Sequence, residues 1–317
     1  MGDVPVHRPV LLREVLSYLE PPHGDALMVD GTLGEGGHSA AFLEKFPGLR
    51  VIGVDRDAEI AARAAQRLEQ YKKRVSIAVS HSRDFFADYR GDAPDVILLD
   101  LGVSLFHYEL SGRGFSFAGA AKDEPLDMRL DRDGALTAAA IIARYKESAL
   151  ADMLFVNGGE RASRRIARLM CEERKRSAIA TTGQLAEIVH RALGPRSGRI
   201  DSATRTFAAL RIEVNAELSL LEPLLEAAFA CLKTGGRLGV ISFHSAEDRI
   251  VKNVFKRFAS GFSCDGSIIK GRIVTKKPVV AADDEIAENP PSRSAKLRVI
   301  EKIPILGVRG TSPPAGF

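Results

Sequence analysis

The feature that most constrains the fold is a glycine-dense loop between a short apolar run and a helix-forming segment. Residues 26–29 are typical of a buried strand, and residues 30–38 then read Asp-Gly-Thr-Leu-Gly-Glu-Gly-Gly-His. Because glycine has no side chain, such a loop lets the backbone approach a ligand closely. A strand, a glycine loop and a helix in this order predict a site for a nucleotide-like ligand.

Further apolar runs predict a parallel sheet. Residues 51–55 and 95–100 are nearly all apolar, and each run ends in an aspartate. Such runs are typical of strands that are buried on both faces. An alanine-rich segment with helical periodicity, residues 58–71, and a short strand pattern at 75–79 lie between them. This alternation predicts βαβ units and an α/β fold.

The carboxyl-terminal third continues the same alternation. We predict a helix over residues 218–232, a strand over 237–243 and a second helix over 246–258. A late strand over 297–301 is expected at an edge of the sheet. Residues 261–294 are rich in Gly, Pro, Lys and Asp, which indicates a long loop.

Residues 112–211 interrupt the alternation, because they show helical patterns without strong strands. We therefore predict an inserted helical subdomain over 112–211, and a sheet domain formed by 1–111 and 212–317. Since both ends of the insertion connect to strands of one sheet, it is expected above the carboxyl ends of those strands, where open α/β sheets bind ligands.

Composition narrows the class of protein. The formal net charge is +4, and no apolar run reaches the about 20 residues that a membrane helix needs. The amino terminus also lacks a secretory signal pattern, so a cytoplasmic protein is expected. The three cysteines, Cys171, Cys231 and Cys264, are widely spaced and predict neither a disulfide framework nor a zinc site.

Asp55 indicates which ligand the glycine loop holds. It ends the second strand, where doubly wound sheets place an acid for the ribose hydroxyls of an adenosine cofactor. The loop reads G-x-x-G-x-G-G, which differs from the G-x-G-x-x-G of dinucleotide enzymes, and no P-loop lysine follows it. This pattern favours S-adenosylmethionine (SAM), with a dehydrogenase and a purely structural turn as the alternatives.

Two later strand ends carry polar side chains. Asp100 ends the run 95–100, where a carboxylate can lie beside both cofactor and acceptor; a simple turn-forming role is the alternative. Ser242 and His244 occupy the equivalent edge of the strand 237–243. We consider both as acceptor-site candidates, although His244 could equally be a structural histidine.

A basic stretch lies inside the predicted insertion. Four arginines, Arg161, Arg164, Arg165 and Arg168, are expected on one face of a helix. Such a face can follow a phosphate backbone. The alternative is an ordinary solvated helix surface.

Several motifs together resemble one known family. They are residues 30–39 (DGTLGEGGHS), 55–57 (DRD), 99–104 (LDLGVS), 113–117 (RGFSF), 125–129 (PLDMR), 204–207 (TRTF), 242–252 (SFHSAEDRIVK) and 292–294 (SRS). In this order, from His7 to about Val299, the chain resembles the bacterial ribosomal RNA small-subunit methyltransferase H family, also called MraW. The resemblance implies SAM-dependent methylation of the exocyclic N4 of a cytidine in the decoding region of 16S rRNA. It also implies a Rossmann-like SAM-dependent methyltransferase sheet with a helical insertion, and the small ribosomal subunit as partner.

The resemblance also implies a set of cofactor-binding residues. They are Gly36, Gly37, His38, Asp55, Phe85, Asp100 and His107. Phe85 is chosen over its neighbour Phe86 from an ambiguous local spacing. The family commonly reads DLGVSSxQ, so His107 stands where a cofactor-contacting glutamine is expected, and an imidazole replaces only part of an amide's hydrogen bonding. No metal site is predicted.

Two alternatives to the RNA cytosine-N4 methyltransferase remain open. One is a SAM methyltransferase with another RNA acceptor, because the cofactor motifs are more general than the acceptor motifs. The other is a non-catalytic rRNA-binding assembly protein that keeps a cofactor pocket, to which His107 adds weight.

Overall fold

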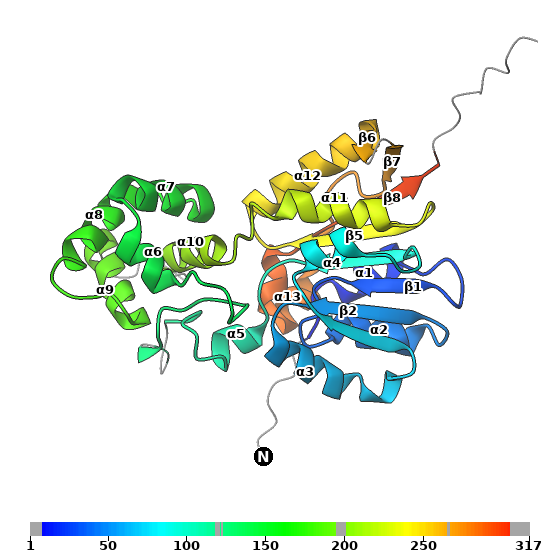
Figure 1. Ribbon diagram of the computed structural model, residues 1–317, viewed down its shortest axis with the longest axis horizontal. Helices are drawn as coiled ribbons and strands as arrows, with labels where there is room; N and C mark the ends of the chain where they lie inside the picture. The colour runs from blue at the N-terminus through cyan, green and yellow to red at the C-terminus, as the bar shows by residue number, and fades with distance from the viewer. Residues whose placement is uncertain (1–7, 118–120, 122, 195–200, 265–266, 305–317) are drawn as a thin grey trace, which may run out of the picture.

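One eight-stranded sheet forms the larger lobe of the protein, to the right in Figure 1. The computed structural model describes residues 8–117, 121, 123–194, 201–264 and 267–304, so the ends of the predicted sheet domain, 1–7 and 305–317, lie outside the described residues. The strands are β1 (Leu27–Asp30), β2 (Arg50–Asp55), β3 (Val75–Val79), β4 (Val96–Asp100), β5 (Arg237–Ser242), β6 (Phe262–Cys264), β7 (Ser267–Ile273) and β8 (Lys296–Ile303).

The strand order is β3-β2-β1-β4-β5-β8-β7-β6. Neighbours within β3-β2-β1-β4-β5 pair in parallel, whereas β8, β7 and β6 are added by antiparallel pairing. All four residues of β1 are buried, as the apolar run predicts. The predicted Rossmann-like α/β sheet is therefore confirmed, and the carboxyl ends of β1, β2 and β4 meet at one edge.

Two predictions for the carboxyl-terminal part are wrong. β8 is not an edge strand, because it lies between β5 and β7. Residues 261–294 are not one long loop, because they contain β6, β7, the helix α13 (Asp283–Glu288) and a 3₁₀ turn, Pro290–Ser294. Gly271 is one reason why the glycine content of this segment wrongly predicts a loop. A Cβ there would lie 2.6 Å from Ile300 Cδ1, so this glycine permits close packing within the sheet.

Helices cover both faces of the sheet. One face is covered by α1 (Leu12–Tyr18), α2 (Gly37–Lys45) and α3 (Ala58–Arg67), whose apolar residues pack with Met28 and Leu98. The other face is covered by α4 (Ser82–Asp88), α11 (Leu221–Cys231) and α12 (Ser245–Ser260), which pack with Val29 and Ile97. Neighbouring residues of a strand thus serve opposite faces, which explains the uninterrupted apolar runs.

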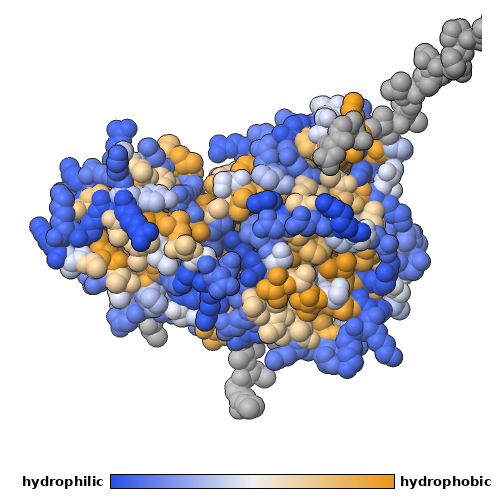
Figure 2. All heavy atoms as spheres, viewed as in Figure 1, coloured by the Kyte–Doolittle hydropathy of each residue, from blue (hydrophilic) through white to orange (hydrophobic). Residues whose placement is uncertain are grey.

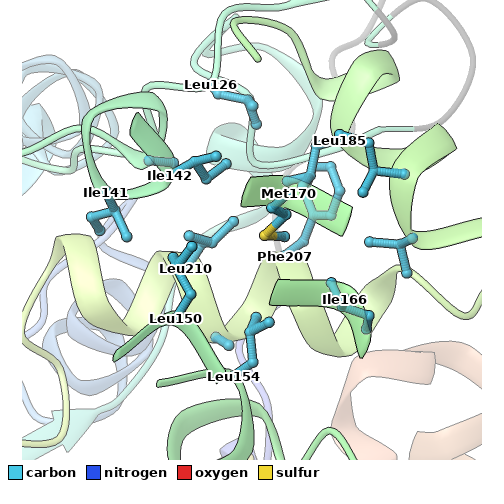
Figure 3. Close-up of a cluster of buried hydrophobic side chains, with 14 of the residues drawn as sticks. Leu126, Ile141, Ile142, Leu150, Leu154, Ile166, Met170, Leu185, Phe207 and Leu210 are labelled. Carbon is cyan, nitrogen blue, oxygen red and sulfur yellow. The ribbon is translucent and has the colours of Figure 1, made fainter. Parts of the chain in front are cut away.

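The smaller lobe is helical and has its own core (Figures 1 and 3). It contains α6 (Ala138–Arg144), α7 (Glu147–Gly158), α8 (Ser163–Glu173), α9 (Thr182–Leu193) and α10 (Thr204–Val214). The buried residues of this core run from Phe115 to Leu210. The predicted boundaries of the insertion stay predictions; the second one, at residue 211, falls inside α10. A short helix, α5 (Leu105–Glu109), connects β4 to this lobe.

Two substitutions on α7 test whether the helical core stabilises this lobe. Leu154 is fully buried, whereas Val156 is 64 % exposed on the same helix. Leu154→Ala should lower the free energy of unfolding by about 2–5 kcal/mol, because it leaves a cavity. Val156→Ala should change it by less than about 0.5 kcal/mol. Denaturant titration followed by circular dichroism measures both, and similar losses of stability for the two variants would contradict a core at Leu154.

Candidate functional site

A cavity of about 340 Å³ lies at the carboxyl ends of β1, β2 and β4. Its walls come from the glycine loop, from the segments after β2 and β4, and from residues 211–224 at the junction of α10 and α11. Its size is within the usual range for a site that holds a small organic ligand. The space-filling view shows polar side chains gathered where the two lobes meet (Figure 2).

The glycine loop is held against the strand ends by hydrogen bonds. The backbone N–H of Gly34 donates to Asp55 Oδ2 (2.9 Å), and the N–H of Asp100 donates to Thr32 Oγ1 (2.5 Å). Gly34 and Gly36 have φ angles of +52° and +76°, which favour glycine. The loop thereby turns sharply from β1 into α2, and residues 31–35 and 37 line the cavity.

Asp55 lines the cavity at the end of β2, as predicted. Its Oδ2 accepts from Gly34, and its Oδ1 accepts from the N–H of Asp57 (2.9 Å). Burial raises the pKa of Asp55, although the two backbone donors act in the opposite direction. These donors fix the carboxylate while each oxygen keeps a further lone pair for a diol.

Asp100 and His38 form a second polar group in the cavity. His38 Nδ1 lies 3.6 Å from Asp100 Oδ2, and His38 Nε2 lies 3.0 Å from the carbonyl of Val10. Asp100 Oδ1 is buried without a hydrogen-bond partner among the described residues. Burial, together with Asp30 and Glu247 nearby, raises the pKa of Asp100 well above its ordinary value. A buried, unsatisfied oxygen in a cavity fits a ligand that donates a hydrogen bond.

His107 also lines the cavity, but both of its ring nitrogens bind protein groups. Its Nδ1 accepts from the N–H of Ser104 (3.2 Å), and its Nε2 lies 3.1 Å from Asp57 Oδ2. The ring therefore ties α5 to the amino terminus of α3. The contact with a cofactor that the family glutamine suggests stays a prediction, and the geometry leaves only the carbon edge of the ring for it.

Asp57 is the centre of this buried network. It is 3 % exposed and caps α3 by accepting from the N–H of Glu59 (3.0 Å). Arg113 Nη1 donates to Asp57 Oδ2 (2.6 Å), and Arg113 Nη2 donates to Glu59 Oε2 (3.0 Å). Burial opposes the charge of Asp57, but His107 and Arg113 outweigh it and lower the pKa of this carboxyl. The start of the helical lobe is thus held close to the end of β2 and to Asp55.

Not every predicted residue lines the cavity. Gly37, His38, Asp55, Asp100 and His107 do, whereas Gly36, Phe85, Ser242 and His244 do not. Phe85 lies on α4, with its ring centroid 5.4 Å from those of Phe86 and Tyr89. His244 caps α12, and its Nε2 lies 3.1 Å from Glu247 Oε1.

Sequence reasoning missed several lining residues. His81 and Ser82 line the cavity directly after β3, and Phe243 and Glu247 do so after β5. The signal that could have found them is position, because residues that follow parallel strands meet at one edge. Tyr108 on α5, Arg211 on α10 and Glu217 in the segment after α10 line another side of the cavity.

The arginines of the predicted basic surface do not line the cavity. Arg164, Arg165 and Arg168 are exposed on α8, and Arg161 is exposed just before that helix begins. Their binding of RNA stays a prediction.

The described residues offer neither a metal centre nor a membrane span. Among them, no group of three or more His, Cys, Asp or Glu is placed to hold a metal ion. No helix in that part of the chain is long and apolar enough to cross a membrane.

Asp30 provides a test of the electrostatics of the site. It is 2 % exposed and accepts a hydrogen bond from Ser39 Oγ (2.6 Å), and burial raises its pKa from 3.8 to about 6. The folded state therefore binds more protons than the unfolded state between these values, so stability falls as the pH rises through that window. The full loss corresponds to roughly 3 kcal/mol.

Asp30→Asn should remove this dependence. Relative to the unsubstituted protein, it should gain about 1–2 kcal/mol of stability between about pH 5 and about pH 7.5. Thermal unfolding measured across this range checks the gain, with Asp88→Asn at an exposed site as the control. A stability difference that stays constant with pH would contradict the buried charge of Asp30.

Comparisons with known proteins show the family to which the chain belongs. The MraW methylase family matches residues 5–303. A protein of Treponema denticola named "Ribosomal RNA small subunit methyltransferase H" is 49 % identical over 94 % of this chain and 98 % of its own length. A protein of Bradyrhizobium diazoefficiens with the same name is 44 % identical over 95 % of this chain and 93 % of its own. The family that the sequence motifs predict, and with it the cofactor S-adenosylmethionine, is therefore confirmed: the chain belongs to the MraW methylase family.

Proposed function

We propose that this protein transfers a methyl group from SAM to the N4 amine of a cytidine in the decoding region of 16S rRNA, with the small ribosomal subunit as its substrate in the cytoplasm. The observation that carries the proposal is the cavity that the glycine loop, Asp55 and the unsatisfied oxygen of Asp100 share. The relatives named for methylation of small-subunit rRNA match this chain over nearly their full length, which supports the substrate.

The cofactor half of the site is the glycine loop with Asp55. Gly34, Gly37 and His38 would lie beside the methionine part of SAM, and Asp55 would accept hydrogen bonds from the two ribose hydroxyls. Bound SAM supplies a methyl group that its sulfonium already activates. The chain's main task is then to orient the acceptor, and an oriented acceptor avoids much of the entropic cost of the reaction.

The acceptor half depends on Asp100. The lone pair of a cytosine amine is delocalised into the ring, so the amine is a weak nucleophile. Asp100 Oδ1 lacks a partner among the described residues and can accept a hydrogen bond from N4, which localises that lone pair. Because its pKa is raised, Asp100 is also a stronger base than an ordinary carboxylate, and we assign to it the proton that N4 loses.

Two groups of residues complete the proposal. Ser242 and His244 would act on the acceptor side indirectly, because their neighbours Phe243 and Glu247 line the cavity. The exposed arginines around α8 would contact the RNA backbone.

Tritiated SAM and small ribosomal subunits that lack the modification test the reaction. Nucleoside mass spectrometry of the product should show label in N4-methylcytidine. Label in another nucleoside would indicate a different RNA acceptor, and RNA binding without transfer would indicate an assembly protein; either result contradicts the proposal.

Asp100→Asn tests the proposed acceptor half within the same assay. It should lower kcat by about 10²–10⁴-fold, since the amide cannot take the N4 proton. Asp88→Asn, at an exposed site on α4, should leave kcat unchanged. A kcat of Asp100→Asn within a few-fold of the parent would remove Asp100 from the proposed chemistry.

Salt titration tests the basic surface. The triple variant Arg164→Ala, Arg165→Ala, Arg168→Ala should bind RNA more weakly than the parent protein. The slope of log K against log salt should flatten by about 0.7 for each phosphate that the variant no longer neutralises. Lys73→Ala, at an exposed position outside the helical lobe, is the matched control. An unchanged slope in the triple variant would identify α8 as an ordinary solvated surface.

A further inference from the structure

One aromatic side chain of the cavity has no assigned role. Seven large hydrophobic side chains are exposed among the described residues, and of these only Tyr108 lines the cavity. Tyr108 lies on α5 and is 37 % exposed. An aromatic ring that is both exposed and part of a ligand cavity can contact the cavity's ligand with its apolar surface.

The ring of Tyr108 is held in place from two sides. Arg211 Nη1 donates to the Tyr108 hydroxyl (2.9 Å), and the ring meets Phe115 in a T-shaped arrangement with the centroids 6.4 Å apart. Since its hydroxyl and its ring both have fixed partners, Tyr108 loses little conformational freedom when a ligand binds against it.

Arg211 is itself fixed by a buried carboxylate. Its Nε and Nη2 donate to the two oxygens of Glu217, at 3.0 and 2.9 Å, and both side chains are largely buried. The guanidinium charge is therefore balanced within the protein. A pair whose charges cancel attracts a phosphate only weakly, so we expect an uncharged ligand on this side of the cavity. The tyrosine ring that the pair holds in place favours a flat one.

We propose that Tyr108, positioned by the Arg211–Glu217 pair, is the stacking platform on which the acceptor nucleobase lies once it has left the RNA stack. This inference rests on the proposed function and names a residue that binds its substrate. Asp100 lines the same cavity, so a base stacked on Tyr108 would share the cavity with the carboxylate assigned to N4. Stacking tolerates any base; selection of cytosine would therefore depend on Asp100.

Three substitutions at one position separate the possible roles of Tyr108. Tyr108→Ala removes the ring, Tyr108→Leu keeps apolar volume without an aromatic face, and Tyr108→Phe removes only the hydroxyl. We expect Tyr108→Ala and Tyr108→Leu to raise KM for the RNA by about 5- to 150-fold, as the loss of one stacked base predicts. Tyr108→Phe keeps the ring but loses the hydrogen bond from Arg211, so its KM should lie between those of the parent and Tyr108→Leu. The Kd for SAM should change less than about twofold in all three variants.

A binding measurement without turnover provides the second readout. A single-stranded RNA carries pyrrolo-cytosine at the target position and is titrated with the full-length protein in the presence of S-adenosylhomocysteine. Stacking should quench the fluorescence of the analogue with the parent protein and Tyr108→Phe. The quenching should be absent with Tyr108→Ala and Tyr108→Leu, while thermal unfolding shows all variants folded.

The outcomes separate this inference from the proposed function. Quenching that survives in Tyr108→Ala, or a Tyr108→Leu variant equal to Tyr108→Phe, would overturn the stacking role even if N4-methylcytidine forms. Ring-dependent quenching supports the stacking role, including the case in which the label appears in a nucleoside other than cytidine.

Discussion

The arrangement of the two lobes depends on one buried carboxylate, Asp57. Its backbone N–H donates to Asp55, and its side chain caps α3 and accepts from His107 and Arg113. These partners belong to the end of β2, to α5 and to the start of the helical lobe. Removing any one partner of a buried charge costs several kcal/mol, because the charge remains without compensation. The network therefore fixes the helical lobe relative to the acid that would bind the cofactor's ribose.

The cavity beside this network is built for a ligand that brings positive charge. Asp55, Asp100 and Glu247 line it, and Asp30 lies buried at the end of β1. Two arginines also line the cavity: Arg211 is paired with Glu217, and Arg56 donates to the carbonyl of Asn215 (3.2 Å). SAM carries a sulfonium, so this excess of carboxylates complements the methyl donor better than the uncharged thioether that remains after transfer. Burial raises the pKa values of Asp30 and Asp100, and nearby carboxylates add to both shifts.

Local sequence patterns predict where the strands of this fold lie in the chain better than they predict which strands pair with one another. The runs at 51–55 and 95–100 are found directly because buried parallel strands are apolar, and β2 and β4 occupy these positions. The position of β8 inside the sheet was not predictable in this way. It depends on antiparallel pairing with β5, some 60 residues earlier in the chain, and with β7, whose polar and glycine residues are typical of a loop. Pairing between distant segments leaves no local periodicity.

In the site, too, sequence patterns predict some residues, whereas others depend on contacts between distant segments. The glycine loop, Asp55 and Asp100 were predictable, because strand ends of a parallel sheet meet at one edge. Phe85 was chosen by residue type, whereas position along the chain would have indicated His81 and Ser82, which line the cavity. His107 was interpreted as a substitute for a ligand-binding glutamine, since nothing in the sequence shows that Asp57 lies within hydrogen-bond distance of it.

A double-mutant cycle between Asp57 and Arg113 tests most directly whether this buried pair joins the lobes. Asp57→Asn, Arg113→Met and the double variant are compared in the free energy of unfolding and in kcat/KM for methyl transfer to RNA. We expect a coupling of at least about 1 kcal/mol in both quantities, because the two groups compensate each other's charge. Effects that add within about 0.3 kcal/mol in both quantities would contradict a pair that joins the lobes.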